Sequence, residues 1–272
     1  MPELPEVETT VRGISPHIAR QMITGVIIRQ ASLRWPISVD IKERLIGKTV
    51  LSVERLGKYV LLKVATGTLL IHLGMSGHLR VQSASVPAKK HDHVDILFGN
   101  NKMLRFNDTR RFGCVLWIEG EVSEHFLLKN LGVEPLTDAF TGQYLWRRAQ
   151  GRKVAIKTLL MDSHIVTGIG NIYASEILFA SGIHPATPAN TLSLSRLNKL
   201  VSCTKLILNR AIEQGGTTLK DFFNSDGKPG YFSVYLQAYG RSGLPCITCQ
   251  TPLTLMKIGQ RSTVYCKKCQ RK

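Results

Sequence analysis

Four cysteines near the C-terminal end of the chain have the spacing of a metal site. Cys246 and Cys249 are separated by two residues, as are Cys266 and Cys269, and sixteen residues lie between the two pairs. Each pair places two thiolates on one tight turn, and two such turns give Zn²⁺ four soft ligands in a closed tetrahedral site. A closed site has no position for a substrate, so we expect one structural zinc ion rather than a catalytic one. We expect no organic cofactor. Two disulfides are the alternative for the same residues.

The second residue, Pro2, is a candidate nucleophile. A small residue at this position permits removal of Met1, which exposes a secondary amine that is partly neutral, and therefore nucleophilic, at about pH 7. Such an amine can attack the anomeric carbon of a sugar and form a Schiff base, and Glu3 beside it can give or take a proton. The alternative is that the MPELPE sequence is only the acidic start of a helix.

The charge of the chain favours a polyanionic partner. Thirty-six Lys and Arg residues against nineteen Asp and Glu residues give a net charge of +17, and no acidic residue follows Asp226. The tail from Gly227 to Lys272 holds eight Lys and Arg residues, so we expect it to face phosphate. Nucleic acid is the expected partner, and a generally basic, solvated surface is the alternative.

The sequence contains no segment typical of secretion or of a membrane span. No run of about 18 consecutive apolar residues occurs. The first ten residues carry acids where a signal peptide carries a basic region and an apolar stretch. We therefore expect a cytoplasmic protein with no membrane partner.

The elements that must position these residues are a helix and a set of short strands. Apolar residues recur at spacings of three and four between Leu4 and Ile18, which predicts a helix with Glu3 at its N-terminal end. From about residue 49 to residue 118, short β-rich runs alternate with Gly, Asn, Asp and Pro. This pattern predicts a β-sandwich or barrel that the helix closes.

The second half of the chain has a helical pattern. A domain boundary is expected at about residues 131 to 136, and helices are expected at about residues 171 to 180 and 194 to 214, the second ending at Gly215 and Gly216. The polar, glycine-containing stretch from Thr217 to Phe232 is predicted to be a long functional loop.

Several motifs identify the family that the chain resembles. They are MPELPEVET, HLGMSGHL, KHDHVDI, DTRRFG, TGIGNIYASEILF, QGGTTLKDF, SDGKPGYF and the four-cysteine tail. Together they resemble formamidopyrimidine-DNA glycosylase, the bacterial repair enzyme for oxidised purines, from residue 2 to residue 270.

The resemblance implies an α+β fold and a bifunctional repair enzyme. The implied domains are a catalytic β-sandwich flanked by helices at residues 1–134, a helix-two-turn-helix domain at residues 135–237 and a zinc finger at residues 238–272. The implied function is base excision repair: removal of 8-oxoguanine and formamidopyrimidines from duplex DNA, followed by lyase cleavage at the abasic site through β,δ-elimination. The resemblance also implies that the protein acts as a monomer.

The resemblance assigns a role to four residues of this chain. Pro2 attacks C1′ of the flipped nucleotide, and Glu3 protonates the sugar as the base leaves. Lys58 assists β-elimination, while Arg261 assists δ-elimination and grips a phosphate beside the lesion.

Further residues are expected to contact the DNA. A flipped nucleotide leaves a gap in the duplex. The resemblance implies that three intercalating side chains fill this gap. They are Met75, Arg110 and Phe112. The expected phosphate and DNA contacts are His91, Arg110, Arg152, Lys157 and Asn171. His91 and His93 could alternatively suggest a metal site, but no third ligand is visible in the sequence.

Two other functions remain as alternatives. The related pyrimidine-directed branch shares the terminal proline, the glutamate and the zinc finger, but Leu4 and the intact loop motifs favour the purine branch. A non-enzymatic zinc-finger module would bind DNA without cleaving it, and it would leave the N-terminal PELPE sequence and Lys58 without a purpose.

Overall fold

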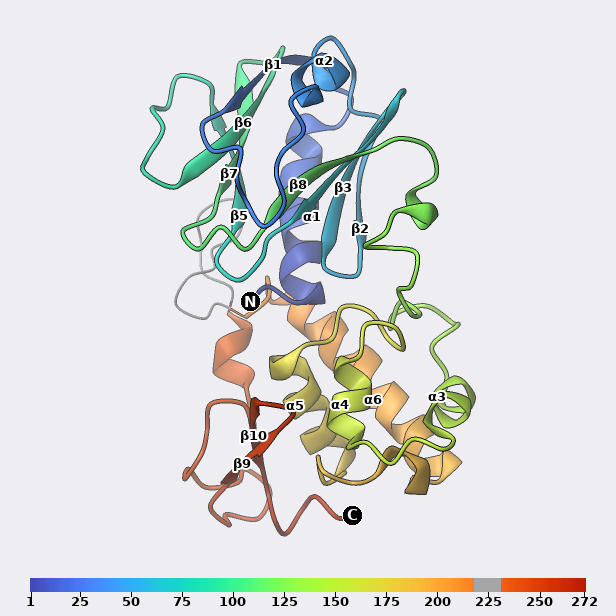
Figure 1. Ribbon diagram of the computed structural model, residues 1–272. Coiled ribbons are helices and arrows are strands. Elements are labelled where there is room, and N and C mark those ends of the chain that lie inside the picture. Colours follow the sequence, from blue (N-terminus) through green and yellow to red (C-terminus); the bar gives the residue numbers. More distant parts are fainter. Residues whose placement is uncertain (218–230) are drawn as a thin grey trace. The chain divides into compact units, whose positions relative to one another are not determined.

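The computed structural model describes residues 1–217 and 231–272, which form two compact units (Figure 1). Unit 1 contains Met1–Lys129 together with the described residues of 214–231. Unit 2 contains Asn130–Glu213 and Phe232–Lys272. The predicted boundary near residues 131 to 136 therefore lies close to the first change of unit.

Unit 1 contains two four-stranded antiparallel sheets. One has the strand order β1-β6-β7-β5 and the other has the order β2-β3-β4-β8. The strands are β1 (Ile23–Ile28), β2 (Ser52–Leu56), β3 (Tyr59–Val64), β4 (Gly67–His72), β5 (His78–Ser83), β6 (Asp92–Phe98), β7 (Lys102–Asn107) and β8 (Cys114–Ile118). The predicted β-sandwich is confirmed.

The helix α1 (Leu4–Ile18) packs against strands of both sheets and completes the core of unit 1. Its apolar face, which includes Val7 and Ile14, belongs to the same buried cluster as Leu69 of β4 and Phe106 of β7. Burial of this face explains why the spacing of three and four predicts the helix correctly. The helix is thereby anchored along its buried face, which fixes the position of the residues at its start.

Three short elements of unit 1 were not predicted. Strand β1 contains Gly25 and a shift of register between Ile23 and Gly25, which interrupts the alternation that marks a strand. The helix α2 (Ile41–Leu45) has five residues, too few for a helical period to be visible. A short 3₁₀ helix, η1 (Val122–Glu124), follows β8.

Unit 2 is mainly helical and ends in a β-hairpin. The predicted helices are confirmed as α5 (Asn171–Ser181) and α6 (Leu194–Glu213), which pack against each other. The other elements are α3 (Gly142–Ala149), α4 (Ile156–Met161), the 3₁₀ helices η2 (Ala189–Thr191) and η3 (Phe232–Tyr235), and the antiparallel strands β9 (Thr254–Ile258) and β10 (Arg261–Tyr265). Strand β10 also contacts α5, which ties the hairpin to the helices. Within the described residues, no helix is long and apolar enough to cross a membrane.

Candidate functional site

The start of α1 brings Pro2, Glu3 and Glu6 together in a buried part of unit 1. Pro2 is buried, and Glu3 and Glu6 are each 2% exposed. Glu3 is the N-cap residue with an extended backbone, and its N–H donates to Glu6 Oε2 at 2.8 Å. This contact satisfies a backbone donor that the helix itself leaves open. Two carboxylates are therefore held in buried positions near the proline.

Glu6 also binds a distant segment of the chain. The N–H of Thr217 donates to Glu6 Oε1 at 2.7 Å. The preceding residue, Gly216, has φ +80°, and a Cβ there would lie 3.1 Å from Glu6 Oε1, so glycine permits this close approach. Thr217 forms an isolated antiparallel bridge with Tyr231. The rest of the predicted loop, residues 218–230, lies outside the described residues.

Lys58 lies in the turn between β2 and β3, where its charge acts on His72. Desolvation, with a smaller contribution from Lys58, lowers the pKa of His72 to about 4, so the imidazole is neutral at neutral pH. Its Nδ1 accepts the N–H of Gly74 at 3.1 Å. His72 therefore supports the loop that carries Met75, and Lys58 helps to keep its imidazole neutral. The sequence analysis did not single out this histidine, although it opens the HLGMSG motif.

A buried carboxylate, Asp108, binds the two loops that carry the predicted intercalating residues. Asp108 is fully buried, and its Oδ1 accepts the hydroxyl of Ser76 at 2.7 Å and the N–H of Arg110 at 3.2 Å. Its Oδ2 accepts the N–H of Gly113 at 2.8 Å. Asp108 was also missed, because its partners lie on both sides of it and up to 32 residues away.

The loop side chains themselves are displayed on the surface. Phe112 is 45% exposed, Arg110 is exposed and Met75 is half-buried. The Arg110 guanidinium lies 4.7 Å from the centre of the Phe112 ring, a cation–π distance. All three residues therefore belong to one surface region of unit 1.

His91 lies next to the same loops. Its carbonyl accepts the N–H of Asp108 at 3.1 Å, and its side chain is half-buried. The neighbouring His93 is buried, and its Nε2 pairs with the Asp108 carbonyl at 2.7 Å. Among the described residues, the two histidines belong to no group of metal ligands.

In unit 2, Asn171 and Arg152 lie at helix boundaries. Asn171 is the first residue of α5, after Gly170 and after Gly168 with φ +86°, and its buried Oδ1 has no hydrogen-bond partner. The start of a helix with aligned N–H groups favours an anion. Arg152 is exposed between α3 and α4, where a charged side chain can reach a ligand.

Lys157 is buried rather than exposed. This α4 side chain is 1% exposed, and its ammonium donates to the Ser262 carbonyl at 3.1 Å and to Thr263 Oγ1 at 2.8 Å. Both partners belong to β10, directly after Arg261. In this arrangement Lys157 supports the hairpin, and a direct phosphate contact by Lys157 stays a prediction.

Arg261 lies where the β9–β10 hairpin turns. It is exposed, and it pairs with Ile258 across a turn in which Gly259 and Gln260 both have positive φ. Its carbonyl accepts the hydroxyl of Thr263 at 3.2 Å, the same hydroxyl that Lys157 contacts. The backbone that carries Arg261 is therefore fixed while the guanidinium remains accessible.

The four predicted metal ligands form one cluster. The sulfur atoms of Cys246, Cys249, Cys266 and Cys269 all lie within 4.8 Å of one another, with 3.9 Å between Cys246 and Cys269 and 3.4 Å between Cys249 and Cys266. Four thiolates around Zn²⁺ at about 2.3 Å require sulfur separations close to these values. The cluster therefore fits a tetrahedral metal ion.

A second buried carboxylate holds the segment that leads to these cysteines. Glu176 on α5 is 4% exposed and accepts the N–H groups of Gln237, Ala238 and Tyr239 at 2.8, 2.9 and 2.7 Å. Burial raises the pKa of Glu176, although the three N–H groups act in the opposite direction. Glu176 was not predicted from the sequence either.

The predicted site residues are thus divided between the two units. Unit 1 carries Pro2, Glu3, Lys58, Met75, His91, Arg110 and Phe112, and unit 2 carries Arg152, Lys157, Asn171, Arg261 and the four cysteines. Within unit 1, His72 and Asp108 hold the segments that carry Met75, Arg110 and His91 through hydrogen bonds. Within unit 2, it connects Lys157 with the backbone of Arg261.

Three family models match almost the whole chain. The formamidopyrimidine-DNA glycosylase N-terminal domain matches residues 1–115, the H2TH domain of the same enzymes matches residues 131–223, and the zinc finger found in FPG and IleRS matches residues 243–271. These matches cover the N-terminal proline, the α5–α6 region and the cysteine cluster.

Sequence relatives and solved structures agree with the family models. The formamidopyrimidine-DNA glycosylases of Hydrogenovibrio crunogenus and Marinobacter nauticus are 54% and 52% identical, over 100% of this chain and 97% and 100% of theirs. A Lactococcus lactis Fpg bound to DNA with an abasic site has a TM-score of 0.92 at 32% identity, covering 99% of this chain and 100% of that one. The Thermus thermophilus MutM protein has a TM-score of 0.88 at 34% identity, covering 99% and 98%. The chain therefore belongs to the formamidopyrimidine-DNA glycosylase family of DNA repair enzymes.

Proposed function

We propose that the protein excises oxidised purines, such as 8-oxoguanine and formamidopyrimidines, from duplex DNA and then cleaves the strand at the abasic site. The observation that carries this proposal is the buried group of Pro2, Glu3 and Glu6 at the start of α1, in a chain that matches its relatives over its whole length. Such a group offers a nucleophile and a proton carrier at adjacent positions.

Pro2 acts as the nucleophile after Met1 has been removed. Its secondary amine attacks C1′ of the damaged nucleotide, and the bond from C1′ to the base breaks as the base takes up a proton. Glu3 protonates the sugar as the base leaves, so that the ring opens to a Schiff base on Pro2. Glu6 positions Glu3 through the hydrogen bond to its N–H.

Lys58 and Arg261 serve the elimination steps that follow. β-Elimination removes a sugar proton and expels the 3′ phosphate, and Lys58 assists this transfer. δ-Elimination expels the 5′ phosphate, whose negative charge Arg261 compensates. The exposure of Arg261 on a fixed hairpin backbone supports this role.

The partner is double-stranded DNA with an oxidised purine or an abasic site. The net charge of +17 supports this partner, and a solved relative from Lactococcus lactis is a complex with N7-benzyl-Fapy-dG-containing DNA, with a TM-score of 0.91 at 32% identity. Met75, Arg110 and Phe112 fill the gap that the flipped nucleotide leaves. Their grouping on loops bound by Asp108 supports this assignment.

The phosphate contacts come from residues of both units. They are His91, Arg110, Arg152, Lys157 and Asn171. The N–H groups at the start of α5, where Asn171 is the first helical residue, support an anionic ligand there. Lys157 is in addition hydrogen-bonded to the hairpin that carries Arg261, so it also supports the position of that arginine.

The metal in the cysteine cluster is zinc, and no organic cofactor is required. Zinc supplies a structural link between the two cysteine pairs and takes no part in the reaction. The catalytic domain comprises residues 1–134, the helix-two-turn-helix domain residues 135–237 and the zinc finger residues 238–272. The protein acts as a monomer in the cytoplasm.

Borohydride trapping tests this function directly. The zinc-loaded protein, with loss of Met1 checked by mass spectrometry, is incubated with a labelled duplex that contains 8-oxoguanine opposite cytosine. A covalent protein–DNA band and strand scission are expected, and both weaken in Pro2→Gly and Glu3→Gln. Glu43→Gln, which changes an exposed carboxylate on α2, is the matched control and keeps both signals.

The other outcomes separate the alternatives. If the protein forms the covalent band with oxidised pyrimidines and not with oxidised purines, it belongs to the pyrimidine-directed branch. Binding of the duplex with no band or cut on oxidised purines, oxidised pyrimidines or abasic sites would leave a DNA-binding module.

A further inference from the structure

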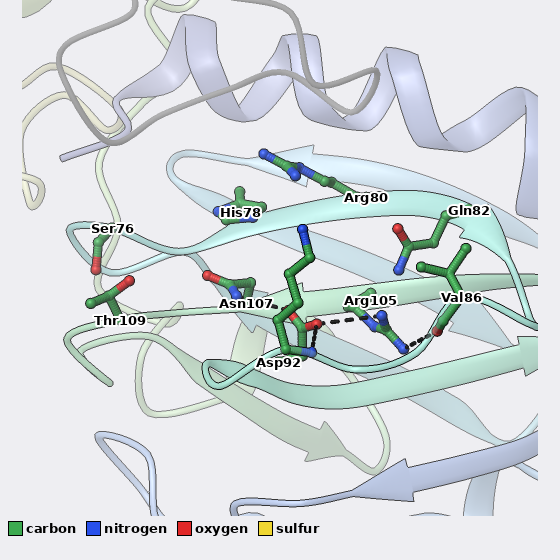
Figure 2. A pocket seen from close by; sticks show the side chains of 10 residues that line it. Ser76, His78, Arg80, Gln82, Val86, Asp92, Arg105, Asn107 and Thr109 are labelled. Atoms are coloured by element: carbon green, nitrogen blue, oxygen red, sulfur yellow. Dashed lines mark hydrogen bonds and ion pairs between the residues drawn. The ribbon is translucent and has the colours of Figure 1, made fainter.

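A pocket on the β1-β6-β7-β5 sheet of unit 1 is lined by polar groups, several of which bind one another (Figure 2). Arg105 lies 3.3 Å from Asp92 and donates to the carbonyl of Val86 at 3.1 Å. Asp92 also accepts the side-chain N–H of Asn107 at 2.7 Å. These contacts hold the sheet and the adjoining loop together, so we assign this pocket a structural role.

A groove of about 390 Å³ in unit 2 has a different character, and we call it the α6–η3 groove. Residues of α5, α6, η3 and the segment that follows η3 line it. Several of these residues have large apolar side chains that are between 46% and 75% exposed: Leu206, Val234, Tyr235 and Ile247. Single exposed apolar side chains are common on protein surfaces, but a group of them around one concave site is typical of a surface that binds a partner.

The side of the groove that η3 contributes is held by buried contacts. The buried ring of Phe232 lies 5.8 Å from the ring of Tyr173 and 6.2 Å from the ring of Tyr235, measured between their centres. Beyond η3, Glu176 of α5 accepts three consecutive backbone N–H groups. The exposed apolar side chains therefore stand on a fixed backbone, which lowers the entropy cost of binding a partner.

The charges around the groove favour an acidic partner. Arg210 is exposed and lies 5.9 Å from the centre of the Tyr235 ring, and it forms no ion pair with any residue that the structure describes. The helix α6 carries four Lys and Arg residues against one Glu, and the lining segment after η3 contains no acidic residue. The carboxylate of Glu176 lines the groove, but three backbone N–H groups and the charge of Arg241 already stabilise it. Arg210 is therefore the charge that an incoming carboxylate meets.

We propose that the α6–η3 groove binds an acidic segment of another protein, with a large apolar side chain against Leu206 and Val234 and a carboxylate on Arg210. Arginine and tyrosine are enriched among the residues that contribute most to protein–protein affinity. A second copy of this chain is disfavoured, because each copy carries a net charge of +17. Duplex DNA would match the charge of Arg210, but its phosphates would not cover the apolar side chains.

This surface goes beyond the proposed repair reaction and does not depend on it. Among the described residues that line the groove, none is a proposed catalytic residue or a metal ligand. Ile247 lies between Cys246 and Cys249 in the sequence. The full zinc-loaded chain is therefore used in every test.

Selection from a random peptide library supplies the probe. Excess undamaged duplex DNA is present throughout, so that acidic peptides cannot accumulate on the DNA-binding surface. We expect the enriched peptides to combine acidic residues with Phe, Trp or Leu and to bind one per chain. No enrichment under these conditions, or enrichment of peptides without acidic or without large apolar residues, would refute the proposal.

Leu206→Asp and Leu255→Asp form the decisive pair. Both leucines are more than half exposed and both changes add one negative charge, but only Leu206 lines the groove. Leu206→Asp is expected to weaken binding of the enriched peptide at least about tenfold, and Leu255→Asp is expected to leave it unchanged. Equal losses in the two variants would show that net charge alone attracts the peptide and would overturn the groove as its site.

A second pair of variants isolates the ionic contact. Arg210→Gln and Lys205→Gln each remove one positive charge from α6, but only Arg210 lines the groove. Arg210→Gln is expected to weaken binding about tenfold, while Lys205→Gln changes it less than about twofold. A peptide whose acidic residues are replaced by their amides should bind the unchanged protein about tenfold more weakly and should no longer respond to Arg210→Gln. An undiminished response to Arg210→Gln would contradict the ionic contact.

The groove and the repair function fail separately. Leu206→Asp should still form the covalent band with 8-oxoguanine DNA, because the change lies in unit 2 and away from Pro2. If the peptide binds as expected but no protein–DNA band forms, the repair function is wrong and the groove stands. If the band forms but Leu206→Asp does not weaken peptide binding, only the groove is overturned.

Discussion

Asp108 in unit 1 and Glu176 in unit 2 both hold irregular segments of the chain, but they bind these segments differently. Each is a buried carboxylate whose acceptor capacity is used mainly by backbone N–H groups. Asp108 collects donors from two loops that follow different strands, whereas Glu176 collects three consecutive N–H groups of one segment. Asp108 therefore fixes two loops relative to each other, and Glu176 fixes one segment against a helix.

The two regions also differ in the further contacts that stabilise the segments bound by Asp108 and by Glu176. Around Asp108, the loops are also joined by the close approach of Gly74 to Gly113 and by the His93 contact with the Asp108 carbonyl. After Glu176, the chain enters the cysteine cluster, where a metal ion can supply most of the stabilisation. The loops around Asp108 are thus held by contacts within the protein, while the segment after Glu176 leads to a cluster that can also bind a metal ion.

Metal removal should give the largest effect and separates the two regions most sharply. Structural zinc contributes about 10–16 kcal/mol in isolated zinc-finger peptides, so a strong chelator should unfold the hairpin. In hydrogen exchange, the N–H groups of Gln237 and Tyr239 should lose protection, while those of Arg110 and Gly113 keep it. Added zinc should restore the protection. Equal loss in both regions would show that the loops at Asp108 also depend on the metal.

Truncation of either carboxylate should come next in size. Asp108→Ala leaves the Ser76 hydroxyl and the Gly113 N–H without an acceptor, while the Arg110 N–H keeps Ser76 Oγ, and it should lower the free energy of unfolding by about 2 kcal/mol. Glu176→Ala leaves three N–H groups without an acceptor and should lower it by about 3 kcal/mol. Asp108→Ala should also weaken binding to damaged duplex DNA, because Arg110 and Phe112 lose their support. Denaturant titration and binding measurements check both effects. Asp138→Ala, an exposed aspartate, should change stability by less than about 0.5 kcal/mol, and a similar loss there would contradict the assigned roles.

The glycine contact in unit 1 offers a smaller and more specific test. Gly74 has φ +63°, and a Cβ there would lie 2.4 Å from the backbone nitrogen of Gly113. Gly240 has φ +76°, and a Cβ there would meet nothing within 4 Å. Gly74→Ala should therefore destabilise the protein by about 2 kcal/mol more than Gly240→Ala, which carries the backbone strain alone. Equal effects in thermal unfolding would mean that the loops can separate without cost.

The smallest expected effect is a dependence on pH that belongs to Glu176. Because burial raises its pKa above the ordinary value of 4.5, the folded protein binds more protons than the unfolded chain between 4.5 and the raised value. Ionisation of Glu176 in this window therefore lowers stability as the pH rises. The free energy of unfolding of the unchanged protein should fall relative to that of Glu176→Gln from pH 4.5 upward. A constant difference between the two proteins across this range would contradict the assignment.

Local patterns predicted much of this fold. The spacing of apolar residues predicted α1 and α6, because each buries a continuous face. The cysteine spacing predicted the metal cluster, because both pairs lie on tight turns. The helix α3 escaped prediction, since it has eight residues, although Thr141 caps it by accepting the N–H of Tyr144 at 3.0 Å.

The residues that hold the site together were less accessible to sequence reasoning. Glu6 and Thr217 are 211 positions apart, and Lys157 and Thr263 are 106 apart. No period or motif connects residues at such separations, because their contact results from the tertiary fold. The burial of Lys157 also departs from the usual tendency of lysine to be exposed, so it could not be predicted from the residue type.

The contact between Glu6 and Thr217 has a consequence for the order in which the protein is assembled. Synthesis proceeds from the N-terminus at about 5–20 residues per second, so α1 and both sheets emerge well before Thr217. Glu6 can accept the N–H of Thr217 only after all of α6 has been made. The N-terminal residues, which are synthesised first, therefore form this contact only after Thr217 has been synthesised. A ribosome stalled before residue 214 would carry a folded β-sandwich in which Glu6 still lacks its contact with Thr217.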